Sequence, residues 1–426
     1  MIKSLHLEHF KNFQDATLRL GPFTVLIGAN ASGKSNIRDA LRFLHGIGMH
    51  YRLAEILGEA YYGSARVWDG IRGGKREVAY SGSETFELGV GMEIPSRDDG
   101  AYHLDYRIGV LAGGSVTMPP RLVQEALNAG DRLVFRTVEG EAQDGKVSVA
   151  LPLVEDKSGQ QPRIMLFPSD APVIAQAEDL ISGLDKLQSA SAVLKELRFL
   201  QFLDPSPLQI RIPSLPGHAI LSDQAQNLSS VLAAICEDPA KKEALLAWVR
   251  KLTPMDVDNL LFDEDAAGRI LLRLVEKDGR SVSALSASDG TLRFLAILAA
   301  LFGPKPASLY FIEEIENGIH PTRLALLVDL IEHQTRRRGI QIVATSHSPQ
   351  LLQVLSDESL KYCSLVYRLP EHPDGRIKPI LEIPNARRVI GEQPVWVLHA
   401  SSWFEDMMDL ADDASPQPEN GNQPAS

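Results

Sequence analysis

The sequence has few cysteines, few aromatic residues and no long apolar run. Aromatic residues make up 6% of the 426 residues, and the two cysteines, Cys236 and Cys363, lie far apart in apolar surroundings. We therefore expect buried, reduced thiols in a cytoplasmic protein rather than a disulfide scaffold. The longest apolar stretch, near Leu292–Phe302, is too short to cross a bilayer, and the amino terminus lacks the apolar core of a signal peptide. No membrane contact is expected.

An excess of positive charge is also absent. The formal net charge of −12 argues against a broad electrostatic grip on nucleic acid, although it leaves room for local basic patches. Part of the acidity lies near the carboxyl terminus, where no Lys or Arg follows Arg388. We expect residues 404–426 to form a disordered acidic tail. With 44% hydrophobic and 23% charged residues, the remaining chain is long enough for a sizeable globular core.

The first 46 residues predict strands, a glycine-rich loop and a helix. Apolar residues alternate from Ile2 to Leu20, and the run FTVLI at 23–27 is typical of a buried strand. After the loop, apolar residues recur at helical spacing, at Ile37, Ala40, Leu41 and Leu44.

The middle of the chain predicts a β-rich insertion. Strand-like runs occur at 85–94, 102–111, 131–138 and 146–154, separated by turn signals. Helices are expected at 184–202, 228–235 and 240–252, and strands at 256–262 and 269–275.

The carboxyl-terminal half alternates apolar strands with helices. A Ser-started helix is predicted at 288–302, buried strands at 308–312 and 339–345, and a helix from near Pro349. Such alternation is typical of a parallel sheet that is covered on both faces.

The loop at 28–35, GANASGKS, fits the pattern GxxxxGK[ST] between a strand and a helix. Backbone N–H groups of such a loop bind phosphates, while Lys34 would reach the β and γ phosphates and Ser35 would hold Mg²⁺. A plain glycine-rich turn before a helix is the alternative. The loop predicts a nucleotide site and leaves kinases, GTPases and motor ATPases open.

Three further segments carry groups that suit a nucleotide site. The apolar run 309–312 ends in Glu313 and Glu314, which can bind Mg²⁺ and polarise a water. Ser288 begins a helix and can aim its N–H groups at an anion, or it is only an N-cap. His347 follows the last buried strand, at the sheet edge where nucleotide sites lie. It can bond a γ-phosphate, or it is incidental beside a capping serine.

The order of these pieces resembles the ABC-type ATPases, and more narrowly the RecF/SMC-like (RecF/OLD-like) branch of bacterial AAA family ATPases. The similar blocks are LHLEHFKNF, VLIGANASGKSN, ASDGTLRFLAILAAL, YFIEEIENGIHP and VATSHSPQLL. They cover about residues 1–46 and 200–370.

The resemblance implies a role for each matching residue. Glu314 matches the catalytic base and His347 the γ-phosphate sensor, while Ser35 and Glu313 match the Mg²⁺ site. Lys11 lies where the family often has a basic residue near the nucleotide. The phosphate-binding loop corresponds to Gly28, Asn30, Gly33, Lys34, Ser35 and Asn36.

The resemblance also implies a homodimer. Ser288 and Gly290 match a signature that caps the nucleotide of the opposite subunit, so ATP would join two chains head to tail. Glu316, Asn317 and Gly318 match the turn toward the partner, called the D-loop.

This sequence departs from the family pattern in three places. Glu313 stands where most P-loop ATPases carry Asp, and Ala287 stands where the signature usually has Leu. The Mg²⁺-binding glutamine of the family cannot be assigned, because no local pattern selects among Gln201, Gln224 and Gln226.

We therefore expect an α/β P-loop NTPase fold, an ABC/SMC-like ATPase head built from 1–46 and 201–385 with a β-rich insertion at 47–200. The expected reaction is Mg²⁺-dependent hydrolysis of ATP. Three interpretations of its purpose stay open: an ATPase acting on double-stranded DNA in repair or recombination, a nucleotide-gated sensor that controls a separate effector protein as in anti-phage defence, and a non-hydrolysing ATP-binding scaffold.

Overall fold

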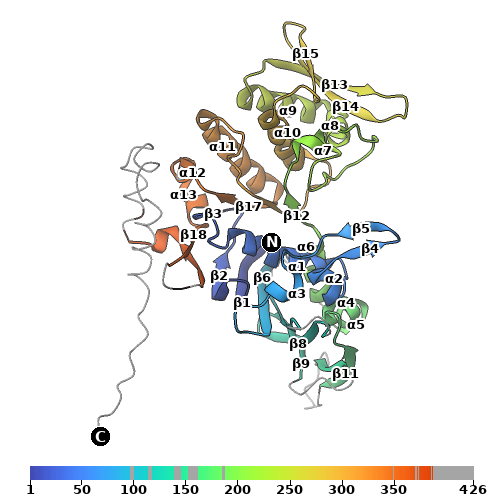
Figure 1. Cartoon of the computed structure of the whole chain (residues 1–426), viewed down its shortest axis with the longest axis vertical. Coiled ribbons are helices and arrows are strands. Elements are labelled where there is room, and N and C mark those ends of the chain that lie inside the picture. Colours follow the sequence, from blue (N-terminus) through green and yellow to red (C-terminus); the bar gives the residue numbers. More distant parts are fainter. Residues whose placement is uncertain are drawn as a thin grey trace.

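The computed structural model describes residues 1–95, 100–113, 118–138, 145–151, 162–184, 188–348, 350–369, 372, 374–384 and 386. The predicted acidic tail at 404–426 lies outside these residues. Figure 1 shows a helical lobe at one end, a central sheet, and a broad β-rich part at the other end. Within the described ranges, no helix combines the length and apolarity that a bilayer span requires.

A six-stranded sheet lies at the centre. Its strand order is β12-β16-β17-β3-β18-β19, and all neighbours are parallel except the pair β18 and β19. Its strands are β3 (Phe23–Ile27), β12 (Leu200–Leu203), β16 (Leu309–Ile312), β17 (Gln341–Ser346), β18 (Cys363–Arg368) and β19 (Gly375–Pro379). The buried strands predicted at 23–27, 308–312 and 339–345 are confirmed.

Both faces of this sheet are covered, because successive side chains of a strand point to opposite sides. Leu26 and Val343 enter the core cluster that contains helix α1 (Lys34–Gly48). Val25 and Ala344 enter the other cluster, beneath α10 (Asp289–Phe302) and α11 (Pro321–Arg338). This two-sided burial explains why the strands are continuous apolar runs.

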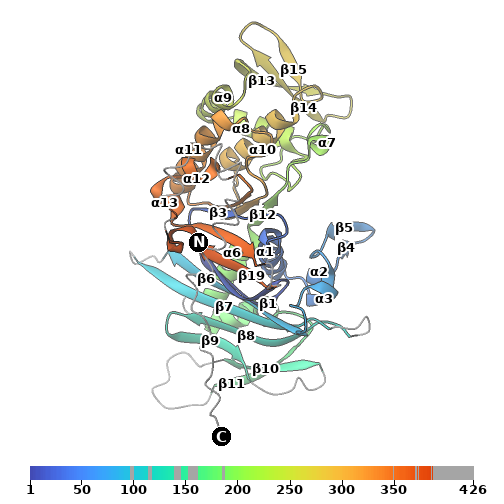
Figure 2. The ribbon, with the colours of Figure 1, turned by 60° about the vertical axis from the view of Figure 1, so that its left-hand side comes forward.

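An antiparallel eight-stranded sheet forms the β-rich part (Figure 2). Its order is β11-β10-β9-β8-β7-β6-β1-β2, so the strands of the predicted insertion continue the sheet that the amino terminus begins. The strands are β1 (Ile2–Phe10), β2 (Phe13–Arg19), β6 (Thr85–Pro95), β7 (Ala101–Leu111), β8 (Arg121–Ala129), β9 (Arg132–Thr137), β10 (Lys146–Leu151) and β11 (Arg163–Pro168). The domain bounds at 46–47 and 200–201 stay a prediction.

The upper lobe combines helices with a three-stranded sheet, β13-β14-β15. The helices predicted at 228–235, 240–252 and 288–302 and the strands predicted at 256–262 and 269–275 are confirmed within one or two residues. The elements are α7 (Pro207–Ile210), α8 (Leu228–Cys236), α9 (Pro239–Leu252), β13 (Val257–Glu264), β14 (Ile270–Glu276) and β15 (Ser281–Ser283).

Short elements complete the described chain. A two-stranded hairpin and small helices follow α1, and further short helices flank the sheets. They are α2 (Leu53–Leu57), β4 (Ala60–Tyr62), β5 (Ala65–Trp68), α3 (Gly74–Glu77), α4 (Val173–Gln176), α5 (Glu178–Leu184), α6 (Ser189–Arg198), α12 (Gln350–Val354), α13 (Asp357–Leu360) and the 3₁₀ helix η1 (Ile380–Glu382). Cys363 is buried, Cys236 is half-buried, and both thiols are free.

The helix predicted over 184–202 is wrong at its end. Helix α6 stops at Arg198, and Leu200–Leu203 is strand β12, paired in parallel with β16. The sequence LQFL at 200–203 fits the end of a helical pattern as well as it fits a short buried strand. The pairing with β16 decides in favour of the strand. Strands β8 and β11 of the eight-stranded sheet and β18 and β19 of the central sheet were also not predicted.

Candidate functional site

The phosphate-binding loop lies at the carboxyl end of β3 and leads into α1. Gly33 caps the helix with φ 118°, a backbone conformation that side chains disfavour. A Cβ at Gly33 would also lie 2.8 Å from the amide nitrogen of Asn12, and one at Gly28 would collide with the carbonyl of Val366. Both glycines are therefore required by the fold of the loop itself.

Lys34 lies inside the loop. Its Nζ donates to the carbonyls of Gly28 at 2.7 Å and Ala29 at 2.8 Å, and lies 3.4 Å from Nδ1 of His347. Burial lowers the pKa of Lys34 to about 8, although the carboxylates of Glu314, Glu316 and Glu313 oppose the shift. A phosphate bound next to this ammonium would favour its charged form and so raise the pKa again.

Glu313 contacts the first turn of α1. The hydroxyl of Ser35 donates to its Oε1 at 2.8 Å, and the Arg38 guanidinium lies 3.8 Å from its Oε2. A hydroxyl and a carboxylate side by side are the hard oxygen donors that Mg²⁺ prefers. The chemistry of these two side chains fits a magnesium ion.

Glu314 is held in an unusual backbone conformation. Its φ of 48° lies in the left-handed region, which costs a non-glycine residue about 1 kcal/mol. Its N–H donates to Thr345 Oγ1 at 3.0 Å, and the Asn317 amide donates to its Oε2 at 3.3 Å. Its Oε1 lies 3.8 Å from Nε2 of His347. Strain that neighbouring elements maintain is typical of a functional position.

His347 is fixed by Glu316. Oε1 of Glu316 accepts from the Ser346 hydroxyl at 2.8 Å and from the His347 N–H at 3.0 Å. Nδ1 of His347 lies 3.0 Å from the Gly28 carbonyl, so the imidazole borders the phosphate-binding loop. The family resemblance implies that Glu316 lies in the turn toward a partner, yet its carboxylate bonds Ser346 and His347 of its own chain. Oε2 of Glu316 is buried without a hydrogen-bond partner.

These groups line one cavity of about 640 Å³ at the carboxyl end of the central sheet. The cavity brings together the loop, the acids of β16 and the histidine after β17, although up to 317 residues separate them. Predicted residues in its lining are Asn30, Gly33, Lys34, Ser35, Asn36, Glu313, Glu314 and His347.

Ser288 and Gly290 line a different cavity, of about 380 Å³, together with Gly318 and His320. Ser288 is the N-cap of α10, and its Oγ accepts from the Thr291 N–H at 3.2 Å. Ser288 is thus an N-cap, as the second interpretation of this residue expected. The N-terminus of α10 also lines a cavity that is separate from the phosphate-binding loop.

Lys11 does not line the loop cavity. Its Nζ donates to the Arg72 carbonyl and lies 3.6 Å from a carboxylate oxygen of Asp39. Burial lowers the pKa of Lys11, and Asp39 opposes this shift. The neighbouring Asn12 contacts the loop instead: its amide donates to the Ser32 carbonyl at 3.1 Å.

Sequence reasoning missed Arg72, Asp204 and Arg293, which also line the loop cavity. Arg72 donates to the Ser35 carbonyl at 2.5 Å and to the carboxylate of Asp39. No local pattern marks Arg72 or Arg293. Asp204 follows β12, and the helical interpretation of 184–202 hid its position at the end of a parallel strand.

None of the three candidate glutamines lines this cavity. Gln201 is buried in β12, where its amide donates to the Leu221 carbonyl. Asp204, three residues later, is the side chain of this segment that lines the cavity.

Two family models match the two parts of the chain that build this site. One, described as an AAA ATPase domain, matches residues 1–51. The other, described as an AAA domain, putative AbiEii toxin, Type IV TA system, matches residues 191–353.

Several proteins are similar in sequence. An ATP/GTP phosphatase of Helicobacter pylori is 23% identical over 377 residues, which cover 83% of this chain and 87% of that protein. A DNA replication and repair protein RecF of Thermosynechococcus vestitus is 42% identical over 50 residues, 12% of this chain and 13% of RecF. RecF of Limosilactobacillus reuteri is 47% identical over 45 residues, 10% and 12% of the two chains.

Solved structures with a similar trace include heads of SMC proteins. The SMC head domain from Thermotoga maritima has a TM-score of 0.40 and 12% identity, with 89% of this chain and 98% of that chain covered. An SmcHead bound to the C-winged helix domain of ScpA has a TM-score of 0.49 and 15% identity, with 88% and 97% covered.

The central sheet, its phosphate-binding loop and the acids and histidine at the same edge are typical of the α/β fold of P-loop NTPases. In sequence, the chain is similar to AAA ATPase domains over residues 1–51 and 191–353 and, over a short stretch, to RecF proteins.

Proposed function

We propose that this protein binds ATP with Mg²⁺ and hydrolyses it to ADP and phosphate. The observation that supports this most strongly is the single cavity of about 640 Å³ that holds Lys34, Glu314 and His347 together. The similarity to an ATP/GTP phosphatase adds support for turnover and makes GTP a second substrate to test.

Each group has a place in the reaction. The Lys34 ammonium and the loop N–H groups bind the β and γ phosphates, while Ser35 and Glu313 would hold Mg²⁺, which neutralises phosphate charge when bound. Glu314 accepts a proton from the attacking water, and His347 donates a hydrogen bond to the γ-phosphate. The pair lies at the cavity wall 3.8 Å apart, so both can reach one phosphate.

We further propose that two chains complete each site. Ser288 and Gly290 line a cavity that does not include the phosphate-binding loop, which supports their action on the nucleotide of a second copy. A two-fold dimer would bring each loop against the partner's α10 N-terminus, where the exposed N–H groups favour an anion. ATP would then hold the dimer together, and hydrolysis would release it.

A mixing experiment tests the shared site. Lys34→Ala removes the loop lysine, and Ser288→Arg blocks the signature, so each variant alone should lack ATPase activity. Random mixing of equal amounts should restore about a quarter of wild-type turnover, because half of the dimers then hold one intact site. Absence of any restored activity, with dimers detected by light scattering, would exclude composite sites.

The simplest experiment on activity measures phosphate release from ATP and GTP beside Glu314→Gln, with Glu264→Gln as a control on an exposed carboxylate. We expect Mg²⁺-dependent turnover that Glu314→Gln abolishes and Glu264→Gln preserves. ATP binding without turnover in the wild type would instead favour the non-hydrolysing scaffold.

For the biological process, we propose a cytoplasmic ATPase that serves DNA repair or recombination. The similarity to RecF proteins supports this, over the short stretch that they share. Double-stranded DNA should then stimulate ATP turnover, and it should do so less at high salt.

A second candidate is a nucleotide-gated sensor that controls a separate effector protein. The family model with a putative toxin description, over residues 191–353, favours it. Turnover that ignores DNA but responds to a co-purifying protein would support this candidate over DNA repair.

A further inference from the structure

Carboxylates lie in a row across three neighbouring strands of the eight-stranded sheet. Glu8 of β1 is directly opposite Asp15 of β2 on one side and Glu87 of β6 on the other. Like charges in directly opposed positions destabilise a sheet. Arg107 lies 3.6 Å from Glu87 but also pairs with Asp105 at 3.1 Å, so its charge is shared.

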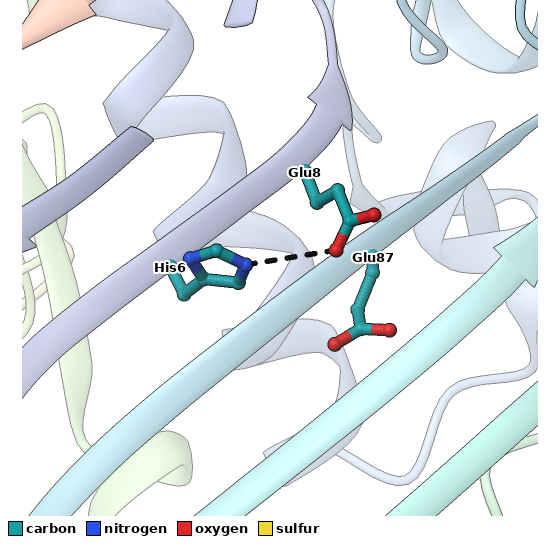
Figure 3. Close-up of side chains that lie close together, drawn as sticks. All are labelled: His6, Glu8 and Glu87. Carbon is teal, nitrogen blue, oxygen red and sulfur yellow. Dashed lines mark ion pairs between the residues drawn. The ribbon is translucent and has the colours of Figure 1, made fainter. Parts of the chain in front are cut away.

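A histidine adjoins this row. His6 is two residues before Glu8 on the same face of β1, and its Nε2 lies 3.7 Å from Oε2 of Glu8 (Figure 3). One nitrogen of His6 and one oxygen each of Glu8 and Glu87 all lie within 4.8 Å of one another. The three side chains are partly exposed, at 23%, 44% and 13%.

The surrounding residues orient these donors. Nδ1 of His6 lies 3.1 Å from the Thr17 hydroxyl, which can accept its proton and leave the Nε2 lone pair free on the side of the glutamates. The amide of Gln124 donates to one oxygen of Glu87. Partners of this kind, behind a histidine and a carboxylate, are typical of metal centres.

Space next to His6 is kept open by a glycine. Gly89 of β6 is directly opposite His6, and a Cβ there would lie 3.3 Å from the Cβ of His6 and 3.4 Å from Cγ of Arg107. The imidazole therefore meets no side chain from its cross-strand neighbour and can turn toward the two carboxylates.

We propose that His6, Glu8 and Glu87 bind one divalent transition-metal ion, for which Zn²⁺ is the probe. An imidazole nitrogen with two carboxylate oxygens matches the ligands of Zn²⁺ in proteins, and three protein ligands leave a fourth position for water. Mg²⁺ and Ca²⁺ prefer all-oxygen sites, so the histidine disfavours them. A dication would also relieve the repulsion within the carboxylate row. The site is separate from the nucleotide cavity and does not depend on the proposed ATPase activity.

Calorimetric titration of the full chain with zinc chloride tests this site, after chelator treatment and in excess Mg²⁺ to occupy oxygen-only sites. We expect His6→Asn and Glu8→Gln each to bind one zinc ion fewer than the wild type. Glu93→Gln is the matched control, because Glu93 lies on the same face of β6 and pairs with Lys3 at 2.6 Å. It should bind as many zinc ions as the wild type.

Equal zinc stoichiometry in all four proteins, or no binding by the wild type, would overturn the proposal. Thr17→Val gives a second measure, since loss of the partner behind a metal-binding histidine weakens metal affinity about 10- to 100-fold. Unchanged zinc affinity in Thr17→Val would show that His6 is not oriented for a metal. Thermal unfolding without zinc checks that each variant is folded.

Discussion

The two large sheets of this protein place their functional groups in different ways. The six-stranded, mainly parallel sheet is covered on both faces, so its chemistry lies in the loops at its carboxyl edge, where groups far apart in sequence converge. The eight-stranded antiparallel sheet leaves part of one face open, and its notable groups, Glu8 and Glu87, lie on the strands themselves. Loops at a sheet edge can rearrange around a substrate, whereas strand residues are fixed by register.

The largest effect should follow from loss of the loop lysine. Lys34→Ala removes a buried charge that would contact phosphate, so we expect ATP affinity to fall about 30-fold or more and turnover to vanish. Lys241→Ala, at an exposed position of α9, should change neither the ATP affinity nor the turnover. Fluorescent-nucleotide titration measures the affinity, and wild-type affinity in Lys34→Ala would remove Lys34 from the site.

The pH dependence of ATP binding tests the same group. The free protein loses the Lys34 proton as the pH rises through about 8, while bound phosphate would favour the charged form. Binding must then take up a proton above that pH, so affinity should decline by up to about tenfold per pH unit. A flat profile between pH 7 and 9.5 would contradict this.

Glu314→Gln should come next in size. Loss of a general base typically lowers turnover by about 10²- to 10⁴-fold, while ATP binding stays intact and the dimer persists. Rapid-quench measurements with size analysis in ATP check both results. Turnover near the wild-type rate would show that another group activates the water.

In the antiparallel sheet, we expect a change of pH to alter the free energy of unfolding rather than the ATPase activity. Glu125 of β8 is fully buried and accepts from the Tyr106 hydroxyl at 2.9 Å and from the N–H groups of Val173 and Ile174. Burial raises its pKa to about 7. The folded state therefore holds a proton that the unfolded chain releases near 4.5, so the stabilisation of the neutral form is lost as the pH rises from about 4.5 to 7.

We expect this loss to be on the order of 3 kcal/mol in the free energy of unfolding. Glu125→Gln keeps the shape of the side chain without the titration, so its stability should be flatter over this pH range. Denaturant titrations at pH 5 and pH 7.5 compare the two proteins. Parallel pH profiles would mean that Glu125 stays ionised in the folded protein.

The smallest effect should come from Glu316, which accepts a hydrogen bond from the His347 N–H and does not line the loop cavity. Glu316→Ala frees the His347 N–H and the Ser346 hydroxyl, so we expect kcat to fall about tenfold with KM nearly unchanged. Glu316→Gln keeps one acceptor oxygen and should recover most of kcat. If both variants raised KM instead, Glu316 would act on nucleotide binding.

Local segments of this protein can be predicted from its amino-acid sequence alone. The phosphate-binding loop, the acids after β16 and the histidine after β17 are recognisable because each is a contiguous segment next to an apolar strand, and strand and loop chemistry act over a few residues. For the same reason the three strands β3, β16 and β17 of the central sheet and most helices of the upper lobe were predictable.

Which side chains lie in contact depends on the pairing and packing of distant segments. Strand β12 pairs with β16, which puts Asp204 at the cavity. Lys11 contacts Asp39 outside the cavity, whereas Arg72 lines it. The opposition of Glu8 and Glu87 depends on the register of two strands some 80 residues apart. Packing and strand register depend on many weak contacts between segments that are far apart in the sequence. A local sequence pattern therefore cannot predict them.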